Sequence, residues 1–238
     1  MANDLKDKVV YITGGSRGIG YGVAQTLLGL GMRVAISGRN EESIRAAAAE
    51  LGKGGEVLGI KSDVGKDGDE ATAMQQVIKH FGKLDVLIAN AGVGYFKPID
   101  ELTDKEWHET IDTNLTGVFH SVKAAIPLLK ESKGYIITIA SLAGTNFFET
   151  ASAYNASKFG LVGFTQAIML DLRKYGIKVS TIMPGSVATH FNNHTPNAED
   201  AWKIQPEDIG KLVTDLLSMD PRTLPSKIEV RPSMPGGK

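Results

Sequence analysis

Tyr154 and Lys158 are the two side chains of this sequence best suited to moving a proton. They stand four residues apart, and the pattern that continues beyond Lys158 is helical, so we expect both on one face of a helix. A free phenol has a pKa of about 10, and a nearby ammonium favours the phenolate and lowers that pKa. The pair therefore predicts acid–base chemistry in which Tyr154 donates and accepts a proton. Taken alone, such a pair is also typical of a solvated helix face.

Ser141 is a third candidate, placed directly after a short apolar run and thirteen residues before Tyr154. A hydroxyl at this point can hydrogen-bond a substrate oxygen and stabilise the negative charge that develops on it. Together the three side chains predict proton transfer to and from a substrate oxygen, with Tyr154 supplying the proton.

A glycine-rich turn over residues 13–20 follows the first apolar run and opens a helical pattern. Gly14 can adopt backbone angles that a side chain forbids, Gly18 lets the backbone approach a pyrophosphate, and Gly20 lets the helix pack closely on the strand. The helix N-terminus then offers free N–H groups to the phosphates. The turn predicts a dinucleotide site at Gly14, Ser16, Arg17, Gly18, Ile19 and Gly20, although tight turns also use glycine for steric reasons alone.

An alternation of short β-branched runs and longer helical patterns must position these residues. We predict strands at 9–13, 33–37, 56–60, 84–89, 134–139, 178–183 and 227–230, and helices at 19–30, 41–51, 70–81, 104–130, 152–174 and 206–218. Because the strand runs lack strict alternation, we expect helices on both faces of a parallel sheet. The sequence predicts an α/β, single-domain Rossmann fold with a doubly wound, seven-stranded parallel sheet. Its cofactor half would span about 1–130 and its catalytic half about 131–231, with a frayed tail at 232–238.

The spacing Thr-Gly-xxx-Gly-Ile-Gly differs from the Gly-x-Gly-xx-Gly fingerprint and resembles the cofactor signature of the short-chain dehydrogenases/reductases. The resemblance extends from Lys8 to Val230, because the family's other motifs follow in order. These are Asp63 after the third strand, Asn90-Ala91-Gly92 after the fourth, Ser141 after the fifth, Tyr154 with Lys158, and Pro184-Gly185 after the sixth. It implies a standard-length member similar to the 3-oxoacyl-[acyl-carrier-protein] reductases. It also implies hydride transfer between a nicotinamide and a carbonyl/alcohol pair, with Tyr154 supplying the proton.

The resemblance also implies roles that the residues alone do not reveal. Asn114 would stand at a helix irregularity, and its backbone carbonyl would hold a water in the proton relay to Lys158. Lys158 itself would hold the hydroxyls of the nicotinamide ribose. The remaining implied cofactor contacts are Asp63 and Val64 at the adenine, Asn90, Ala91 and Gly92 along the cofactor, and Pro184, Gly185, Val187 and Thr189 beyond the sixth strand. As isolated residues, Asp63 and Asn90 are ordinary turn formers, and an asparagine within a helix is a mild helix weakener.

The choice between NADP and NAD is made at the end of the second strand, where an acidic side chain binds the ribose 2′-hydroxyl and repels a 2′-phosphate. Here Gly38 stands at that position and Arg39 follows, with a guanidinium suited to bidentate phosphate contact. Arg17 is a second cation within reach of the same phosphate. The two arginines predict NADP(H), although Arg39 could instead pair with Glu41 or Glu42 at the surface.

The segment from His190 to about residue 204 is short and polar, which favours an open, tolerant substrate pocket. His190 and His194 are four residues apart without a third ligand, so we interpret them as solvated loop residues and predict no metal site. Further expected pocket positions are Leu142, Ala143, Gly144, Phe147, Phe148 and 94–96. Their aromatic side chains indicate an apolar substrate or, equally, packing. A 3-oxoacyl thioester or a broad range of ketones and aldehydes would fit.

Composition excludes several other classes of protein. With 26 Lys and Arg against 27 Asp and Glu, no charge excess favours nucleic acid or an anionic membrane as a partner. The chain has no cysteine, which excludes disulfides, zinc–thiolate sites and thiol catalysis. Neither a signal peptide nor a membrane span is evident, so we expect a cytoplasmic protein.

Apolar residues on the predicted helices 104–130 and 152–174 extend beyond one stripe, which indicates core or subunit contact. The resemblance implies that these helices pair in a dimer or tetramer. Two rival functions are an NADP(H)-binding regulatory protein without turnover and a Rossmann-like transferase that uses another nucleotide. The catalytic side chains argue against the first, and a tyrosine base argues against the second.

Overall fold

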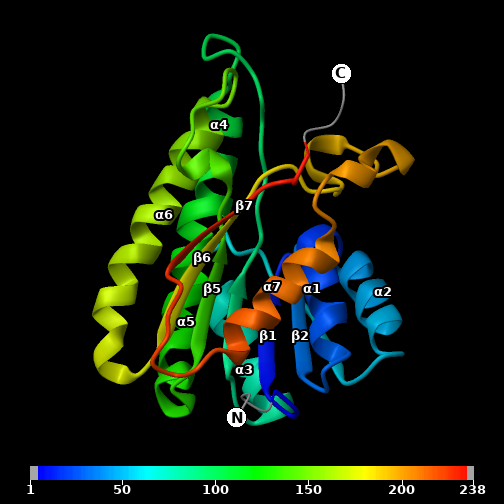
Figure 1. Ribbon diagram of the computed structural model, residues 1–238, viewed down its shortest axis with the longest axis vertical. Coiled ribbons are helices and arrows are strands. Elements are labelled where there is room, and N and C mark those ends of the chain that lie inside the picture. Colours follow the sequence, from blue (N-terminus) through cyan, green and yellow to red (C-terminus); the bar gives the residue numbers. More distant parts are fainter. Residues whose placement is uncertain (1–4, 235–238) are drawn as a thin grey trace.

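The computed structural model describes residues 5–234, in which all seven strands form one parallel sheet in the order β3-β2-β1-β4-β5-β6-β7 (Figure 1). The strands are β1 (Val9–Thr13), β2 (Arg33–Gly38), β3 (Val57–Lys61), β4 (Val86–Ala89), β5 (Tyr135–Ile139), β6 (Lys178–Pro184) and β7 (Lys227–Val230). This confirms the predicted doubly wound Rossmann sheet. Residues 235–238 of the expected tail lie outside the described residues.

Alternate residues of β1 explain why the strands are apolar throughout. Val10 and Ile12 pack into one core, whereas Val9 and Tyr11 pack into a second core on the opposite face of the sheet. All four side chains are fully buried. Because successive side chains of a strand point to opposite faces, a sheet covered on both sides needs apolar residues at every position.

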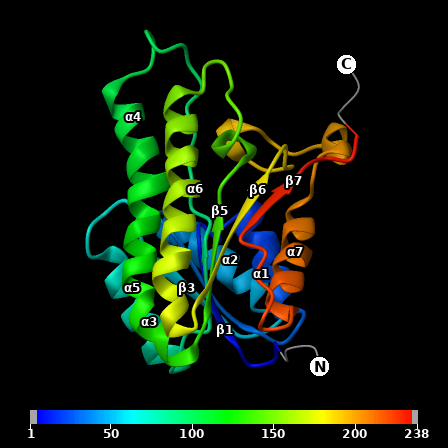
Figure 2. The same cartoon turned by 60° about the vertical axis from the view of Figure 1, so that its left-hand side comes forward.

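Helices cover both faces of the sheet (Figures 1 and 2). The first core includes α1 (Gly18–Leu28), α2 (Glu41–Leu51) and α7 (Pro206–Ser218), and the second includes α3 (Asp69–Phe81), α5 (Gly117–Ser132) and α6 (Ser152–Leu172). The prediction of a single helix at 104–130 is wrong in one respect. It is divided into α4 (Asp104–Ile111), a π-helical turn (Asp112–Thr116) and α5.

The strand order reverses next to β1, which pairs with β2 on one side and β4 on the other. In open α/β sheets, ligands bind beyond the carboxyl ends of the strands at this reversal. The motifs predicted after β1, β2, β4, β5 and β6 therefore meet at one edge of the sheet. Within residues 5–234, no helix combines the length and apolarity needed to cross a membrane.

Candidate active site

The glycine-rich turn has the backbone that the sequence predicts. Gly14 and Gly18 have φ angles of 67° and 60°, in the left-handed region that favours glycine. A Cβ added at Gly20 would lie 2.5 Å from the carbonyl oxygen of Gly14 and 2.6 Å from the side-chain Nδ2 of Asn90. The turn is thus folded tightly on itself, with the N-terminus of α1 at its end.

Asn90 holds this turn against β4. Its Nδ2 donates to the carbonyl oxygens of Thr13 at 2.9 Å and Gly14 at 3.0 Å. In return, Thr13 Oγ1 accepts hydrogen bonds from the backbone N–H groups of Asn90 and Ala91, both at 3.0 Å. The side chain of Asn90 therefore supports the glycine-rich turn from the neighbouring strand.

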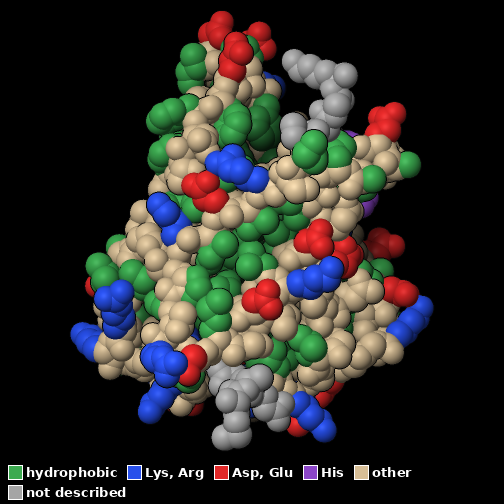
Figure 3. All heavy atoms as spheres, viewed as in Figure 1, with side chains coloured by type: hydrophobic (Ala, Val, Ile, Leu, Met, Phe, Trp, Pro, Cys, Tyr) green, Lys and Arg blue, Asp and Glu red, His purple; other side chains and the backbone are tan. Residues whose placement is uncertain are grey.

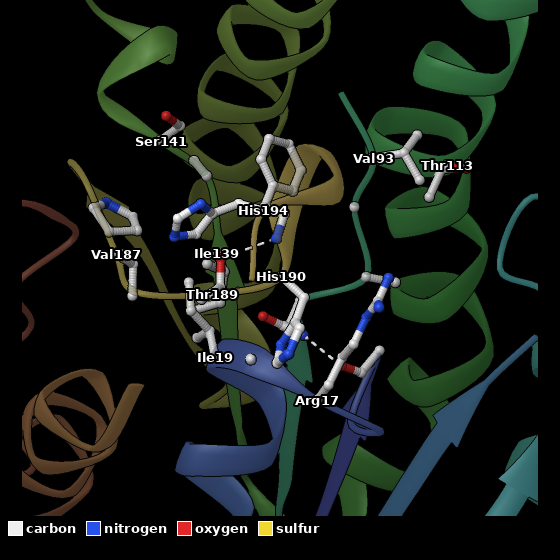
Figure 4. Close-up of a pocket in the computed structure, with 18 of the residues that line it drawn as sticks. Arg17, Ile19, Val93, Thr113, Ile139, Ser141, Val187, Thr189, His190 and His194 are labelled. Atoms are coloured by element: carbon white, nitrogen blue, oxygen red, sulfur yellow. Dashed lines mark hydrogen bonds between the residues drawn. The ribbon is translucent and has the colours of Figure 1, made fainter. Parts of the chain in front are cut away.

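A cavity of about 1180 Å³ opens at this edge of the sheet. It exceeds the usual size of a small-molecule site, and Figure 4 shows residues from several elements around it, including Arg17, Thr113, Ser141 and Thr189. The predicted site residues that line it are Gly14, Ser16, Arg17, Gly18, Ile19, Arg39, Val64, Asn90, Ala91, Gly92, Ser141, Tyr154, Lys158, Pro184, Gly185, Val187 and Thr189. Among the described residues, no carboxylate side chain lines it, whereas several cations do. The residues thus fit a long anionic ligand such as a dinucleotide.

Three predicted site residues stand behind the cavity wall. Gly20 packs inside the turn, Asn114 is completely buried, and Asp63 lies beside the lining residues Ser62 and Val64. Asp63 Oδ1 accepts a hydrogen bond from the backbone N–H of Gly65 at 3.1 Å. That bond is typical of an aspartate that stabilises a turn, and the adenine contact of Asp63 stays a prediction.

Tyr154 is half-buried and carries a perturbed phenol. Burial raises its pKa to about 12, and a side-chain hydrogen bond with Ser141 opposes that rise. This corrects the expectation that Lys158 lowers the pKa of Tyr154. The ammonium nitrogen of Lys158 lies 5.7 Å from the centre of the phenol ring, and burial of the phenol is the larger effect.

Lys158 is buried, with 4% of its surface exposed. Its Nζ donates to the carbonyl oxygen of Ile139, the last residue of β5, at 3.0 Å. Burial lowers the pKa of Lys158 to about 8, because an ammonium loses solvation in the protein interior. Ser141 follows two residues after Ile139, and its Oγ accepts a hydrogen bond from the backbone N–H of Ala143 at 3.1 Å.

Asn114 lies in the π-helical turn between α4 and α5, so the helix irregularity implied by the resemblance is present. Its Oδ1 accepts from the backbone N–H of Val93, and its Nδ2 donates to the carbonyl oxygen of Val93, both at 2.8 Å. Nδ2 also donates to Ser157 Oγ at 3.0 Å. π-helical turns frequently occur at functional sites, and here the turn ties the β4 loop to α6.

Arg39 forms an ion pair that the sequence did not reveal. Its Nη1 lies 3.0 Å from Oε1 of Glu109 in α4, rather than near Glu41 or Glu42. Glu41 instead pairs with Arg45 and Lys61. The missed residue, Glu109, stands 70 positions from Arg39, so no local signal could have linked them. Among the described residues, Arg17 is exposed and has no ion pair.

Aromatic side chains surround Tyr154. Its ring centre lies 5.4 Å from that of Phe96 and 5.5 Å from that of Phe191. Phe148 and Leu142 also line the cavity, as predicted. The prediction was wrong for Phe147, which is 85% exposed and stacks on Phe159 outside the lining, and the cavity lining does not include Ala143, Gly144, Gly94 or Tyr95.

The segment after β6 differs from the simple polar loop that we expected. It contains two short 3₁₀ helices, Phe191–Asn193 and Ala198–Trp202, and Phe191 and Trp202 contribute apolar surface to the cavity. His194 is not merely solvated, because its Nε2 lies 2.6 Å from Oδ2 of the buried Asp200. Over the described part of the chain, no group of three or more His, Asp or Glu residues could hold a metal ion.

Comparisons with known proteins agree with this geometry. A sequence model of the family described as short chain dehydrogenase matches residues 8–200. An uncharacterized oxidoreductase of Staphylococcus aureus is 33% identical over 229 residues, covering 96% of this chain and 98% of the relative. Two solved structures are also similar. An alcohol dehydrogenase of the archaeon Thermococcus sibiricus, complexed with 5-hydroxy-NADP, has a TM-score of 0.90 at 29% identity and covers 96% of this chain and 97% of its own.

The second structure is a metagenomic short-chain oxidoreductase in complex with NADP. It has a TM-score of 0.85 at 33% identity and covers 98% of this chain and all of its own. The matched range, residues 8–200, includes the glycine-rich turn, Asn114, Ser141, Tyr154 and Lys158. Motifs, fold and near full-length similarity therefore agree, and the chain belongs to the short-chain dehydrogenase family of oxidoreductases.

Proposed function

We propose that the protein is an NADP(H)-dependent oxidoreductase that interconverts a carbonyl compound and a secondary alcohol. One observation carries the proposal: Ser141, Tyr154 and Lys158 line the same cavity as the glycine-rich turn. A hydride donor bound along that turn would lie beside a proton donor and an oxyanion partner. An NADP(H)-binding protein without turnover would have no need of this arrangement.

In this proposal the protein residues control the proton, and bound NADPH supplies a hydride to the carbonyl carbon. Ser141 hydrogen-bonds the substrate oxygen, and the hydroxyl of Tyr154 donates the proton that the oxygen needs. A pKa of about 12 keeps this phenol protonated at neutral pH, which suits a donor in the reducing direction. Lys158, with a pKa of about 8, holds a proton at Nζ near neutral pH and can restore the one that Tyr154 gives up. We also propose that Asn114 serves the water-mediated relay to Lys158.

Cations support the preference for NADP(H) over NAD(H). Arg17 and Arg39 line the cavity, and the position that would carry an acidic residue is Gly38. The alcohol dehydrogenase of Thermococcus sibiricus and the metagenomic oxidoreductase were crystallised with 5-hydroxy-NADP and NADP. We therefore propose that NADPH gives the higher kcat/KM.

The walls around Tyr154 favour an apolar carbonyl substrate. Phe96 and Phe191 pack against the phenol ring, and Leu142 and Trp202 extend the apolar lining. Aromatic walls bind apolar groups of a substrate through burial and ring contacts. Ketones, aldehydes and 3-oxoacyl thioesters are the classes to be tested.

Subunit association is part of the proposal. On α5 and α6, large apolar side chains are exposed to solvent: Phe119 is 47% exposed and Leu170 is 59% exposed. Figure 3 shows further hydrophobic side chains gathered on the face where β7 forms the edge of the sheet. Exposed apolar surface of this kind marks interaction sites, and we propose a homodimer or homotetramer.

The test is a panel assay that follows the loss of NADPH absorbance with ketones, aldehydes and 3-oxoacyl thioesters. At least one class should be reduced, and Tyr154→Phe should lower kcat/KM by more than about a hundredfold, within the usual contribution of a general acid. Tyr175→Phe removes an exposed phenol elsewhere and serves as the matched control. Activity of Tyr154→Phe within about tenfold of the wild type would contradict the role of the phenol, and no turnover across the panel would favour a regulatory protein.

A further inference from the structure

The ion pair between Arg39 and Glu109 joins a residue that lines the cavity to a helix residue outside the lining. Arg39 follows β2 and lines the cavity, whereas Glu109 belongs to α4 on the other side of the sheet. The side chain of Arg39 is 52% exposed and that of Glu109 is 27% exposed. A carboxylate thus lies within 3.0 Å of the guanidinium that the proposed function assigns to a phosphate.

Glu109 is held in this position by a second contact. Its Oε1 accepts from Arg39 at 3.0 Å, while its Oε2 accepts from the hydroxyl of Tyr95 at 2.7 Å. Both hydrogen bonds lower the pKa of Glu109, with the bond from Tyr95 the larger cause, so the carboxylate is charged at neutral pH. With both oxygens engaged, the negative charge is fixed beside Arg39.

We infer that Glu109 is a specificity-determining residue for the cofactor, because its carboxylate competes with the 2′-phosphate of NADP(H) for Arg39. The inference rests on the proposed NADP(H) dependence. A 2′-phosphate that binds Arg39 must displace Glu109 or share the guanidinium with it, and like charges at such a distance repel. In both cases the carboxylate weakens binding of a 2′-phosphorylated ligand and leaves a ligand without that phosphate unaffected.

The strength of the competition follows from the exposure of the pair. Exposed ion pairs contribute about 0.2–1 kcal/mol, so removal of the charge at Glu109 should tighten phosphate binding by up to about fivefold. Arg17, which has no ion pair among the described residues, keeps its full attraction for the phosphate. The protein would therefore prefer NADP(H), but less strongly than its two arginines alone imply.

The experiment measures dissociation constants by calorimetry for adenosine 2′,5′-bisphosphate and adenosine 5′-monophosphate, which differ only in the 2′-phosphate. Glu109→Gln should bind the bisphosphate about two- to fivefold more tightly than the wild type and the monophosphate equally. Tyr95→Phe keeps the carboxylate of Glu109 but removes the hydrogen bond that positions it. This variant should therefore also bind the bisphosphate more tightly than the wild type, by a smaller factor than Glu109→Gln. Glu42→Gln makes the same charge change three residues from Arg39 in the sequence without touching the pair, and it should match the wild type.

A double-mutant cycle assigns the effect to Arg39. In the background of Arg39→Met, the change Glu109→Gln should no longer alter the affinity for the bisphosphate. Unchanged or weaker bisphosphate binding by Glu109→Gln in the wild-type background would overturn the inference. The wild type alone tests the underlying cofactor proposal: equal affinity for the two nucleotides would refute the preference for NADP(H), whatever the variants show.

Discussion

Replacing Lys158 with methionine is expected to stabilise the protein at neutral pH while it removes the proposed activity. The side chain is 4% exposed, and burial lowers its pKa from 10.5 to about 8. Since each pKa unit corresponds to about 1.4 kcal/mol, the charged form destabilises the folded state by about 3 kcal/mol. The hydrogen bond from Nζ to Ile139 offsets about 1 kcal/mol of this. Methionine keeps an apolar stem of similar length, so we expect the free energy of unfolding to rise by about 1–2 kcal/mol.

The pH dependence of this gain identifies its cause. Below about pH 8, Lys158 holds its proton in both the folded and the unfolded state, and the full penalty of burial is present. Between about pH 8 and 10.5 the unfolded state still binds the proton and the folded state has released it, so the stability of the wild type rises with pH. The advantage of Lys158→Met should therefore be complete at about pH 7. It should be lost or slightly reversed by about pH 10.5, because the pH-dependent penalty of about 3 kcal/mol exceeds the net gain.

Urea unfolding at about pH 7 and about pH 10 measures both effects as shifts of the transition midpoint. Lys211→Met is the control, because Lys211 is 74% exposed on α7, and its replacement should change stability by less than about 0.5 kcal/mol at either pH. Two results would refute the reasoning. Lys158→Met could unfold at lower urea than the wild type at pH 7, or its advantage could be the same at both pH values.

Three further predictions test the support of the site and the assembly of the protein. Gly20→Ala should weaken NADPH binding by at least about tenfold in calorimetry, because a Cβ there would lie 2.5 Å from the carbonyl oxygen of Gly14. Gly163→Ala, where a Cβ meets nothing within 4 Å, should bind normally, and equal binding by both variants would contradict the argument. Asn114→Ala should lower the free energy of unfolding by about 2–3 kcal/mol in urea, because it leaves backbone groups of Val93 unpaired; a loss below about 0.5 kcal/mol would show that they find other partners. Light scattering should return a dimer or tetramer at micromolar concentration, and a monomer would refute subunit contact through α5 and α6.

Elements whose boundaries depend on local interactions could be predicted from the sequence. The helices predicted at 41–51 and 206–218 begin and end at those residues in the structure. Asn40 caps the first, since its side chain accepts a hydrogen bond from the backbone N–H of Ser43, and Pro206 stands at the first position of the second. Each of these signals acts within one turn of helix, so the residue types alone carry it.

The break in the helix predicted at 104–130 depends on contacts that are distant in the sequence. Asn114 reaches back 21 positions to Val93 and forward 43 positions to Ser157. Helix propensity and apolar spacing carry no trace of such partners, and by those signals the segment is one amphipathic helix. Only the resemblance to a family indicated an irregularity here, because it includes information on how the chain packs.

The choice of cofactor also depends on a contact between residues that are distant in the sequence, here an electrostatic one. The sequence around Arg39 contains no carboxylate at the selective position, and the only competing partners that this segment suggests for Arg39 are Glu41 and Glu42. An electrostatic potential depends on distance in space, and the fold brings Glu109 to 3.0 Å from the guanidinium. If Arg39 binds the 2′-phosphate as we propose, its affinity for that group is a difference between two attractions, one for the ligand and one for Glu109. We therefore expect a substitution of Glu109, on α4, to alter the preference between NADP(H) and NAD(H) without any change at the end of β2.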